Sequence, residues 1–173
     1  MKKVLKLTLA VVCVMFSSSL FAQKIGYVNT DEIIANMKET QDAYTQLEAY
    51  AKDLQAQAET IQVEFNNKYQ EFQKGYETMT DAVRQLKEKE LTDLNTRIQE
   101  FQRVAQQDLQ KKENELMAPI YEKVKTTIDE VAKAGGYTVI LPGGALIYVD
   151  PAQVKDIAPE VKAKLGVTTP AAQ

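Results

Sequence analysis

The chain has 173 residues, a formal net charge of −3 at neutral pH, one cysteine and no histidine. Cys13 and every serine lie within the first 22 residues, so the rest of the chain lacks the usual activated nucleophiles and the commonest general base. Zinc sites also draw mainly on cysteine and histidine. The carboxylates are spaced as on ordinary exposed helix faces, so we expect neither an enzyme nor a metal or cofactor site.

The first 22 residues have the pattern of a secretory signal peptide. Lys2 and Lys3 precede an apolar run from Leu7 to Phe16, and a plausible cleavage site follows Ala22. That run is too short to span a bilayer. We expect residues 1–22 to be removed during secretion.

Removing those residues takes away three lysines and no acid, which leaves 18 basic against 24 acidic residues and a net charge of −6. Residues 39–118 hold 10 basic and 16 acidic residues, so the acidity belongs to that segment. A nucleic-acid-binding protein needs clustered lysine and arginine to neutralise phosphates. The charge pattern therefore argues against a nucleic-acid partner.

The first element expected after the signal peptide is a short strand at 24–29. Asn29 then has the position of a helix N-cap, and Glu32 three residues later completes a capping box. The buried side of the helix that follows is expected to be formed by Ile33, Ile34 and Met37.

The long central segment contains only one glycine, Gly75, and one proline, Pro119. This scarcity of helix breakers predicts a helical hairpin with arms from about Glu39 to Lys74 and from about Asp81 to Ala118. At 1.5 Å per residue the arms would be ~54 and ~57 Å long, and so matched in length. Pro119 is expected to mark a kink where the second arm ends.

The tip of the hairpin is expected near residues 75–80. Gly75 could adopt the left-handed conformation that ends a helix, Thr80 or Thr78 could cap the next helix, and Asp81 would complement its dipole. The alternative is one continuous helix of about 80 residues that tolerates Gly75 at ~1 kcal/mol and forms a coiled-coil rod. The hairpin is favoured because strands on both sides of it need to meet.

Apolar residues in each arm follow a narrow stripe, which predicts knobs-into-holes packing between the two helices. The first stripe takes alternating steps of three and four, then inserts an extra four that would locally unwind the supercoil. Its positions are Tyr44, Leu47, Ala51, Leu54, Ala58, Ile61, Phe65, Tyr69, Phe72 and Tyr76. The second stripe is looser, with Glu90 and Lys112 at seam positions, and comprises Val83, Leu86, Leu94, Ile98, Phe101, Ala105, Leu109 and Leu116.

Beyond Pro119 an apolar helical stripe runs to Gly135-Gly136. Two apolar runs, 137–141 and 145–149, flank Pro142-Gly143-Gly144, a pattern that predicts a β-hairpin.

Asp150-Pro151 resembles the start of a helix. A last short helix is expected from Pro159 to Leu165, stopped by Gly166, and residues 168–173 would form a frayed tail.

These elements predict an α+β protein, mainly α, in which residues 39–118 form the hairpin arm. Residues 23–38 and 119–167 would form a small body with a β-sheet. The strands are apolar at consecutive positions, which implies burial on both faces, and we expect copies of the chain to cover one of them. The residues expected at this oligomerisation surface are Ile25, Tyr27, Val28, Val139, Leu141 and Ile147.

Three segments around the hairpin resemble the Skp/OmpH family of periplasmic chaperones. They are residues 25–29 (Ile-Gly-Tyr-Val-Asn), 136–141 (Gly-Tyr-Thr-Val-Ile-Leu) and 154–166 (Val-Lys-Asp-Ile-Ala-Pro-Glu-Val-Lys-Ala-Lys-Leu-Gly). The resemblance implies a homotrimer in the periplasm with helical arms around a cavity. It also implies an ATP-independent holdase that keeps unfolded outer-membrane β-barrel proteins from aggregating. Well-studied members have basic arms whereas these are acidic, so no lipopolysaccharide site is inferred.

A holdase needs modest apolar patches outside the interhelical seam. Tyr50, Tyr69, Tyr76 and Met79 are therefore the candidate client-binding residues. The alternative for each is ordinary packing against a neighbouring helix. The alternative function for the whole chain is a secreted coiled-coil spacer or adaptor that binds a folded partner.

Overall fold

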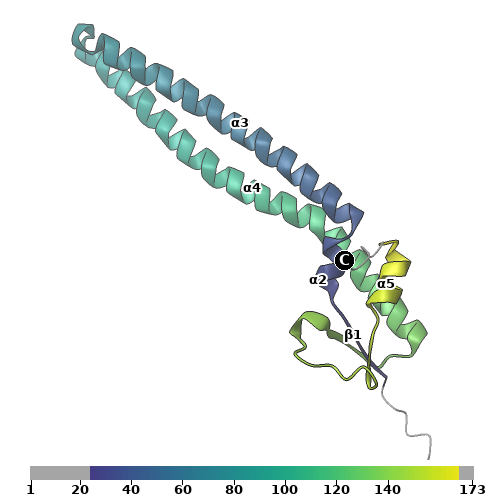
Figure 1. Ribbon diagram of the computed structural model, residues 1–173. Helices are drawn as coiled ribbons and strands as arrows, with labels where there is room; N and C mark the ends of the chain where they lie inside the picture. The colour runs from purple at the N-terminus through teal and green to yellow at the C-terminus, as the bar shows by residue number, and fades with distance from the viewer. Residues whose placement is uncertain (1–23, 168–173) are drawn as a thin grey trace, which may run out of the picture. The chain divides into compact units, whose positions relative to one another are not determined.

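Figure 1 shows a computed structural model of the protein, which describes residues 24–167. The predicted signal peptide and the tail at 168–173 lie outside the described residues. The chain divides into two compact units. One, called the body here, combines the segment that ends at Ile33 with the segment that begins at Val124; the other, called the arm, runs from Ile34 to Lys123. The fold is mainly α-helical with one small sheet in the described range, as predicted.

The sheet of the body has three strands in the order β2-β1-β3, all parallel to the central one. The strands are β1 (Ile25–Val28), β2 (Val139–Pro142) and β3 (Val154–Asp156). In the register of the sheet, Ile25 pairs with Val139 on one side and with Val154 on the other. The first strand is therefore confirmed, and it occupies the centre of the sheet.

The predicted β-hairpin is wrong. Residues 143–145 form a short 3₁₀ helix, η2 (Gly143–Ala145), and the apolar run at 146–149 is not a strand. Asp150 does not start a helix either: its carboxylate accepts a hydrogen bond from the Ala152 amide at 2.9 Å, which makes a turn that leads into β3. The second partner strand for β1 thus comes from farther along the chain than the apolar pattern indicated.

Helices of the body close over its core. The α2 helix (Thr30–Ala35) begins at Asn29, whose side chain accepts a hydrogen bond from the Glu32 amide at 3.4 Å, so the predicted cap is confirmed. The α5 helix (Ala158–Leu165) ends at Gly166, which has the left-handed φ of 70° expected of a helix-ending glycine. The buried apolar residues of the body are Val28, Ile33, Val124, Ile157, Ala158 and Val161.

Two ion pairs attach α5 to the other body helices. Lys162 is largely buried, and its ammonium donates to the Glu32 carboxylate at 2.5 Å. Lys164 pairs with Glu130. Because breaking a pair that holds a buried charge costs more than breaking an exposed one, the first contact is the more important.

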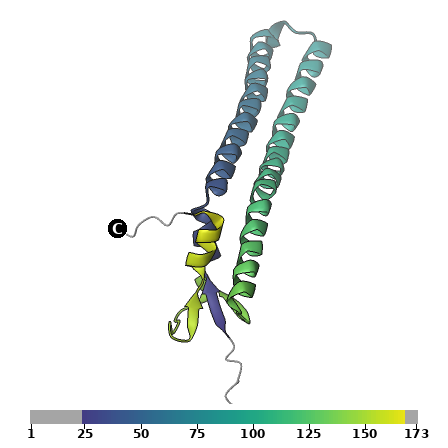
Figure 2. The same ribbon diagram turned by 90° about the vertical axis from the view of Figure 1, so that its right-hand side faces the viewer.

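The arm is an antiparallel helical hairpin, as predicted. Figures 1 and 2 show α3 (Lys38–Gly75) and the first part of α4 (Asp81–Gly135) side by side along their length. The α4 helix does not end at Ala118. It continues through Pro119 into the body, so the predicted second arm and the predicted helix beyond it are one helix.

The tip turns by a different device from the one predicted. Gly75 has φ −92° and ψ −6°, which is not left-handed, and the chain passes into η1 (Tyr76–Thr78). A Cβ on residue 75 would lie 2.6 Å from Met79 Cε, the end of a flexible side chain that could shift to make room. Thr80 caps α4 as predicted: its hydroxyl accepts a hydrogen bond from the Val83 amide at 3.4 Å.

The contact between η2 and β1 generates a prediction for stability. A Cβ at Gly143 would lie 3.0 Å from the amide nitrogen of Asn29 and 3.1 Å from the carbonyl carbon of Val28, both backbone atoms. Gly143→Ala should therefore lower the free energy of unfolding by about 1–3 kcal/mol, the usual cost of overpacking. Urea unfolding followed by circular dichroism measures this.

Gly144→Ala is the matched control, because a Cβ at Gly144 has no atom within 4 Å. Equal unfolding free energies for the two variants would contradict the close contact.

Candidate functional site

The middle of the arm is held by the predicted apolar seam. Ile61 on α3 and Leu94 on α4 are buried, and the seam residues around them are half-buried because two helices alone cover only one side of each. The half-buried members are Leu47, Ala51, Leu54, Ala58 and Phe65 on α3, and Ile98, Phe101, Ala105, Leu109 and Leu116 on α4. These seam assignments are confirmed.

Five predicted seam positions are wrong. Tyr44, Tyr69, Tyr76, Val83 and Leu86 are 56%, 44%, 41%, 42% and 57% exposed. Beyond Phe65 the inward positions of α3 keep the regular alternation of steps, and there is no inserted step of four. They are Lys68, Phe72 and Gly75, and Met79 continues the same step after η1. A lysine thus takes the seam position that the aromatic pattern assigned to Tyr69.

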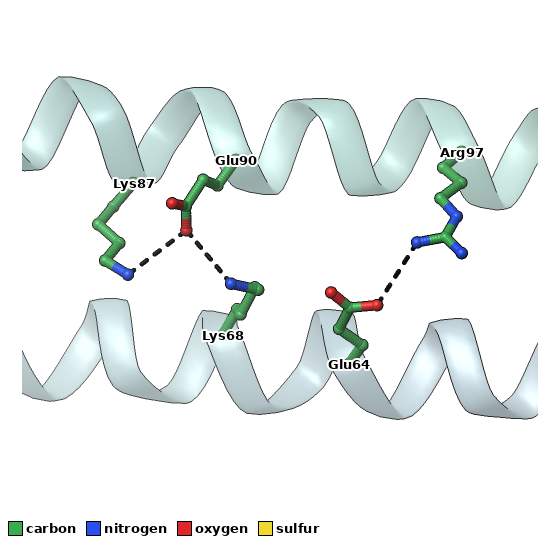
Figure 3. Close-up of polar contacts among 5 residues, drawn as sticks. All are labelled: Glu64, Lys68, Lys87, Glu90 and Arg97. Carbon is green, nitrogen blue, oxygen red and sulfur yellow. Dashed lines mark hydrogen bonds and ion pairs between the residues drawn. The ribbon is translucent and has the colours of Figure 1, made fainter.

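Charged side chains meet across the distal seam, which is the part of the seam nearer the tip at residues 75–80 (Figure 3). Glu90 on α4 accepts from Lys68 on α3 and from Lys87 on its own helix, both at 3.4 Å. Farther along, the Arg97 guanidinium lies 3.6 Å from the Glu64 carboxylate. Hydrogen bonds from Lys87 and Lys68 lower the pKa of the Glu90 carboxyl below its ordinary value, and the bond from Lys87 has the larger effect.

This charged seam distinguishes the distal arm from the middle. Half-exposed ion pairs contribute little to stability in water, whereas an apolar seam contributes through burial. Charged residues at core positions of a coiled coil also specify register at a cost in stability. The distal arm is therefore the weaker part of the hairpin.

Two of the predicted client-binding residues, Tyr76 and Met79, lie at the tip. The Tyr76 ring packs edge-on against Phe72 with centroids 5.4 Å apart, and the Arg84 guanidinium lies 4.5 Å from the Tyr76 centroid. Met79 packs over Gly75. Tyr76 keeps 41% of its surface exposed, so it both packs and remains accessible.

The other two lie elsewhere on the arm. Tyr69 stacks on Phe65 with centroids 6.1 Å apart, and Tyr50 is half-buried on the part of α3 nearer Lys38. The four residues are therefore spread along the arm and do not form one site. Whether they bind a client stays a prediction.

A groove that the sequence analysis missed runs along one side of the hairpin. Its larger part has a volume of about 590 Å³, with a floor of Ala51, Leu54, Ala58, Phe101, Ala105 and Leu109. A smaller part of about 160 Å³ continues it to Ile61 and Ile98. The groove exists because alanine side chains are too short to fill the space between the helices. Its rim carries glutamines, among them Gln55, Gln99, Gln102 and Gln106. Glutamine repeating beside alanine seam positions was the signal available in the sequence.

Within residues 24–167, no cluster of three or more histidine, cysteine, aspartate or glutamate side chains could hold a metal ion. None of the helices in that range combines the length and the hydropathy needed to cross a bilayer.

A small parallel sheet joined to a long α-helical hairpin defines the class of protein. The sequence profile of the family described as "Outer membrane protein (OmpH-like)" matches residues 24–165. The chain therefore belongs to the OmpH-like family.

Its relatives include two proteins named Chaperone protein Skp. That of Yersinia enterocolitica is 28% identical over 149 residues, which cover 84% of this chain and 87% of the relative. That of Pectobacterium atrosepticum is 25% identical over 140 residues, which cover 81% and 84%. The crystal structure of an OmpH-like protein from Caulobacter crescentus superposes with a TM-score of 0.72 over 82% of each chain at 16% identity, which shows the same fold.

The Glu90 cluster generates a pH-dependent prediction. Because the folded pKa of Glu90 is lowered, its contribution to stability is present above the unfolded value, about 4.3, and is lost as the pH falls through the folded pKa. Glu90→Gln should therefore lower the urea midpoint at pH 7, and the difference from wild type should vanish near pH 2.

Glu88→Gln, at an exposed acid two residues away, serves as the control and should leave the midpoint unchanged at both pH values. A Glu90→Gln effect of the same size at pH 7 and at pH 2 would contradict the ion-pair explanation.

Proposed function

We propose that this protein is an ATP-independent holdase chaperone of the periplasm that binds unfolded outer-membrane β-barrel proteins and prevents their aggregation. The observation that carries the proposal is the long two-helix arm in a chain whose relatives are named Chaperone protein Skp. The function is binding, without a chemical step.

The physics of such a client fits the arm. A strand of a transmembrane barrel alternates apolar and polar side chains, and before insertion its apolar side has no cover. A holdase must shield that side with many weak contacts while leaving the chain unfolded. The arm offers partly exposed aromatic rings and a surface groove over a long stretch of helix.

The client-binding residues proposed here are Tyr50, Tyr69, Tyr76 and Met79. Tyr69 and Tyr76 carry most weight, because they are 44% and 41% exposed and each ring is held by an aromatic neighbour. A ring already fixed in position loses little entropy when a client covers it.

The body is proposed to join copies of the chain, most simply as a trimer. Ile147 and Tyr148 are 104% and 81% exposed, and Val139 on the edge strand β2 is 45% exposed. A contiguous exposed apolar segment of this kind marks an interaction surface, and closed cyclic assemblies are the usual outcome. Among the other body residues predicted for this surface, Ile25, Tyr27 and Leu141 are half-buried, and Val28 is buried in the single chain.

The test combines native mass spectrometry with suppression of aggregation, in nucleotide-free buffer, of a urea-unfolded outer-membrane barrel protein. We expect a mass of three copies and clear suppression by the wild type. Tyr69→Gln combined with Tyr76→Gln should keep the mass and weaken client affinity about tenfold, since two partly covered rings lose roughly 1.4 kcal/mol together. Ile147→Asp should give the single-chain mass.

Tyr44→Gln combined with Tyr121→Gln is the matched control, since both rings are more than half exposed on the arm and neither is a proposed contact. Absence of suppression by the wild type would contradict the holdase and favour a spacer that binds a folded partner. A single-chain mass for the wild type would refute the assembly.

A further inference from the structure

The groove along the arm has a length that suits a short extended segment. Its lining spans Ala51 to Gln62 on α3 and Ile98 to Leu109 on α4. Each stretch covers 11 helical steps, or about 16 Å at 1.5 Å per residue. An extended strand rises about 3.3 Å per residue, so about five residues fit, with three alternate side chains facing the floor.

The rim of the groove suits an exposed peptide backbone. A glutamine amide has both a donor and an acceptor, so it can pair with a backbone carbonyl or a backbone N–H. The side chains of Gln99, Gln102 and Gln106 are exposed and have no hydrogen-bond partner among the described residues. A helix pairs its backbone N–H and carbonyl groups internally and therefore needs no such partners. An extended chain outside a sheet has unpaired backbone groups and does need them.

The charge of the groove also differs from that of its surroundings. Its charged lining residues are Arg103 and Glu59, one of each sign. The Arg103 guanidinium already donates to Glu100 and Gln107, and the Glu59 carboxylate accepts from Gln55. Between residues 39 and 118, where the net charge is −6, this neutral strip would accept a segment whatever its own charge.

The two sides of the hairpin are therefore unlike. Helical periodicity places Asp53, Glu64 and Arg97 beside the seam on the opposite side, and the ion pair between Glu64 and Arg97 bridges the helices there. One side is crossed by charges, and the other is a neutral apolar groove with amides at its rim.

We infer that this groove, from Ala51 to Gln62 on α3 and from Ile98 to Leu109 on α4, binds one extended client segment of about five residues with alternating apolar and polar side chains. The apolar side chains lie on the alanine-lined floor, and the glutamine amides pair with the client backbone. This inference rests on the proposed holdase function and defines the chemical pattern that the arm selects.

The experiment measures binding of two labelled nine-residue peptides by fluorescence anisotropy. One alternates leucine and threonine, and the other has the same composition with its leucines adjacent. The groove variant is Gln99→Ala, Gln102→Ala and Gln106→Ala, and the control is Gln70→Ala, Gln73→Ala and Gln85→Ala, at exposed glutamines outside the groove. Alanine is a strong helix former, so both variants should keep the helical circular dichroism of the wild type.

We expect the wild type and the control to bind the alternating peptide at least fivefold more tightly than the groove variant does. The peptide with adjacent leucines should bind weakly to all three proteins. An equal loss of affinity for the alternating peptide in the groove and control variants would overturn the inference. Equal affinity of the wild type for the two peptides would overturn it as well. A changed assembly mass in the groove variant would overturn it too, because the groove would then be a contact between copies.

Testing the same proteins for suppression of barrel-protein aggregation distinguishes failure of the groove inference from failure of the proposed holdase function. If the wild type suppresses aggregation while the groove and control variants bind the peptides equally, the groove inference is refuted and the holdase function remains supported. Failure of the wild type to suppress aggregation would remove the holdase, and the groove's role with it.

Discussion

Apolar contact between two antiparallel helices is the interaction on which the arm depends. The seam of α3 and α4 is one stripe wide, so it closes the hairpin without making a globular core, and most of its residues remain half-buried. It brings together side chains far apart in sequence, such as Lys123 and Glu39, whose ammonium and carboxylate lie 2.5 Å apart. Long exposed flanks follow from that narrowness, and in the proposed function they are the surface available to a client.

Variation along the seam gives the arm three different surfaces. Alanines in the middle leave the groove, charged residues around Glu90 replace apolar contact farther out, and the packed rings of Phe72 and Tyr76 close the tip. A strong seam in the middle and a weaker one beyond it would let the distal arm separate locally at lower cost than the rest. Such local freedom would suit the proposed holdase, which must hold clients of many shapes.

The long helices of the fold and the points where they end could largely be predicted from the sequence. The scarcity of glycine and proline predicted the hairpin, because a breaker-free segment has few other solutions, and Gly166 correctly ended the last helix. The β-hairpin was wrong because consecutive apolar residues show burial without identifying the partner strand. Here β1 takes both neighbours in parallel, and residues 146–149 remain outside the sheet. Gly75 was assigned a left-handed conformation, whereas it has φ −92° and leads directly into η1.

The candidate site was harder to predict for a similar reason. Tyr69 was placed in the seam on aromatic identity, although the regular step leads to Lys68, whose aliphatic stem can line a seam while its ammonium reaches Glu90. The groove consists of missing side-chain volume between two helices, so it can be recognised only when their relative register is known. Glutamines at 99, 102 and 106 look like any solvated helix face until Ala58 and Ala105 are placed between the helices.

The distance between residues 39 and 123 tests the closed hairpin most directly. Spin labels on cysteines introduced there, in protein without Cys13 and diluted with unlabelled copies, report the separation within one chain. We expect a short distance set by the label tethers, because the groups replaced lie 2.5 Å apart. A separation near 126 Å, as about 84 residues of uninterrupted helix would give, would contradict the antiparallel seam and everything built on it.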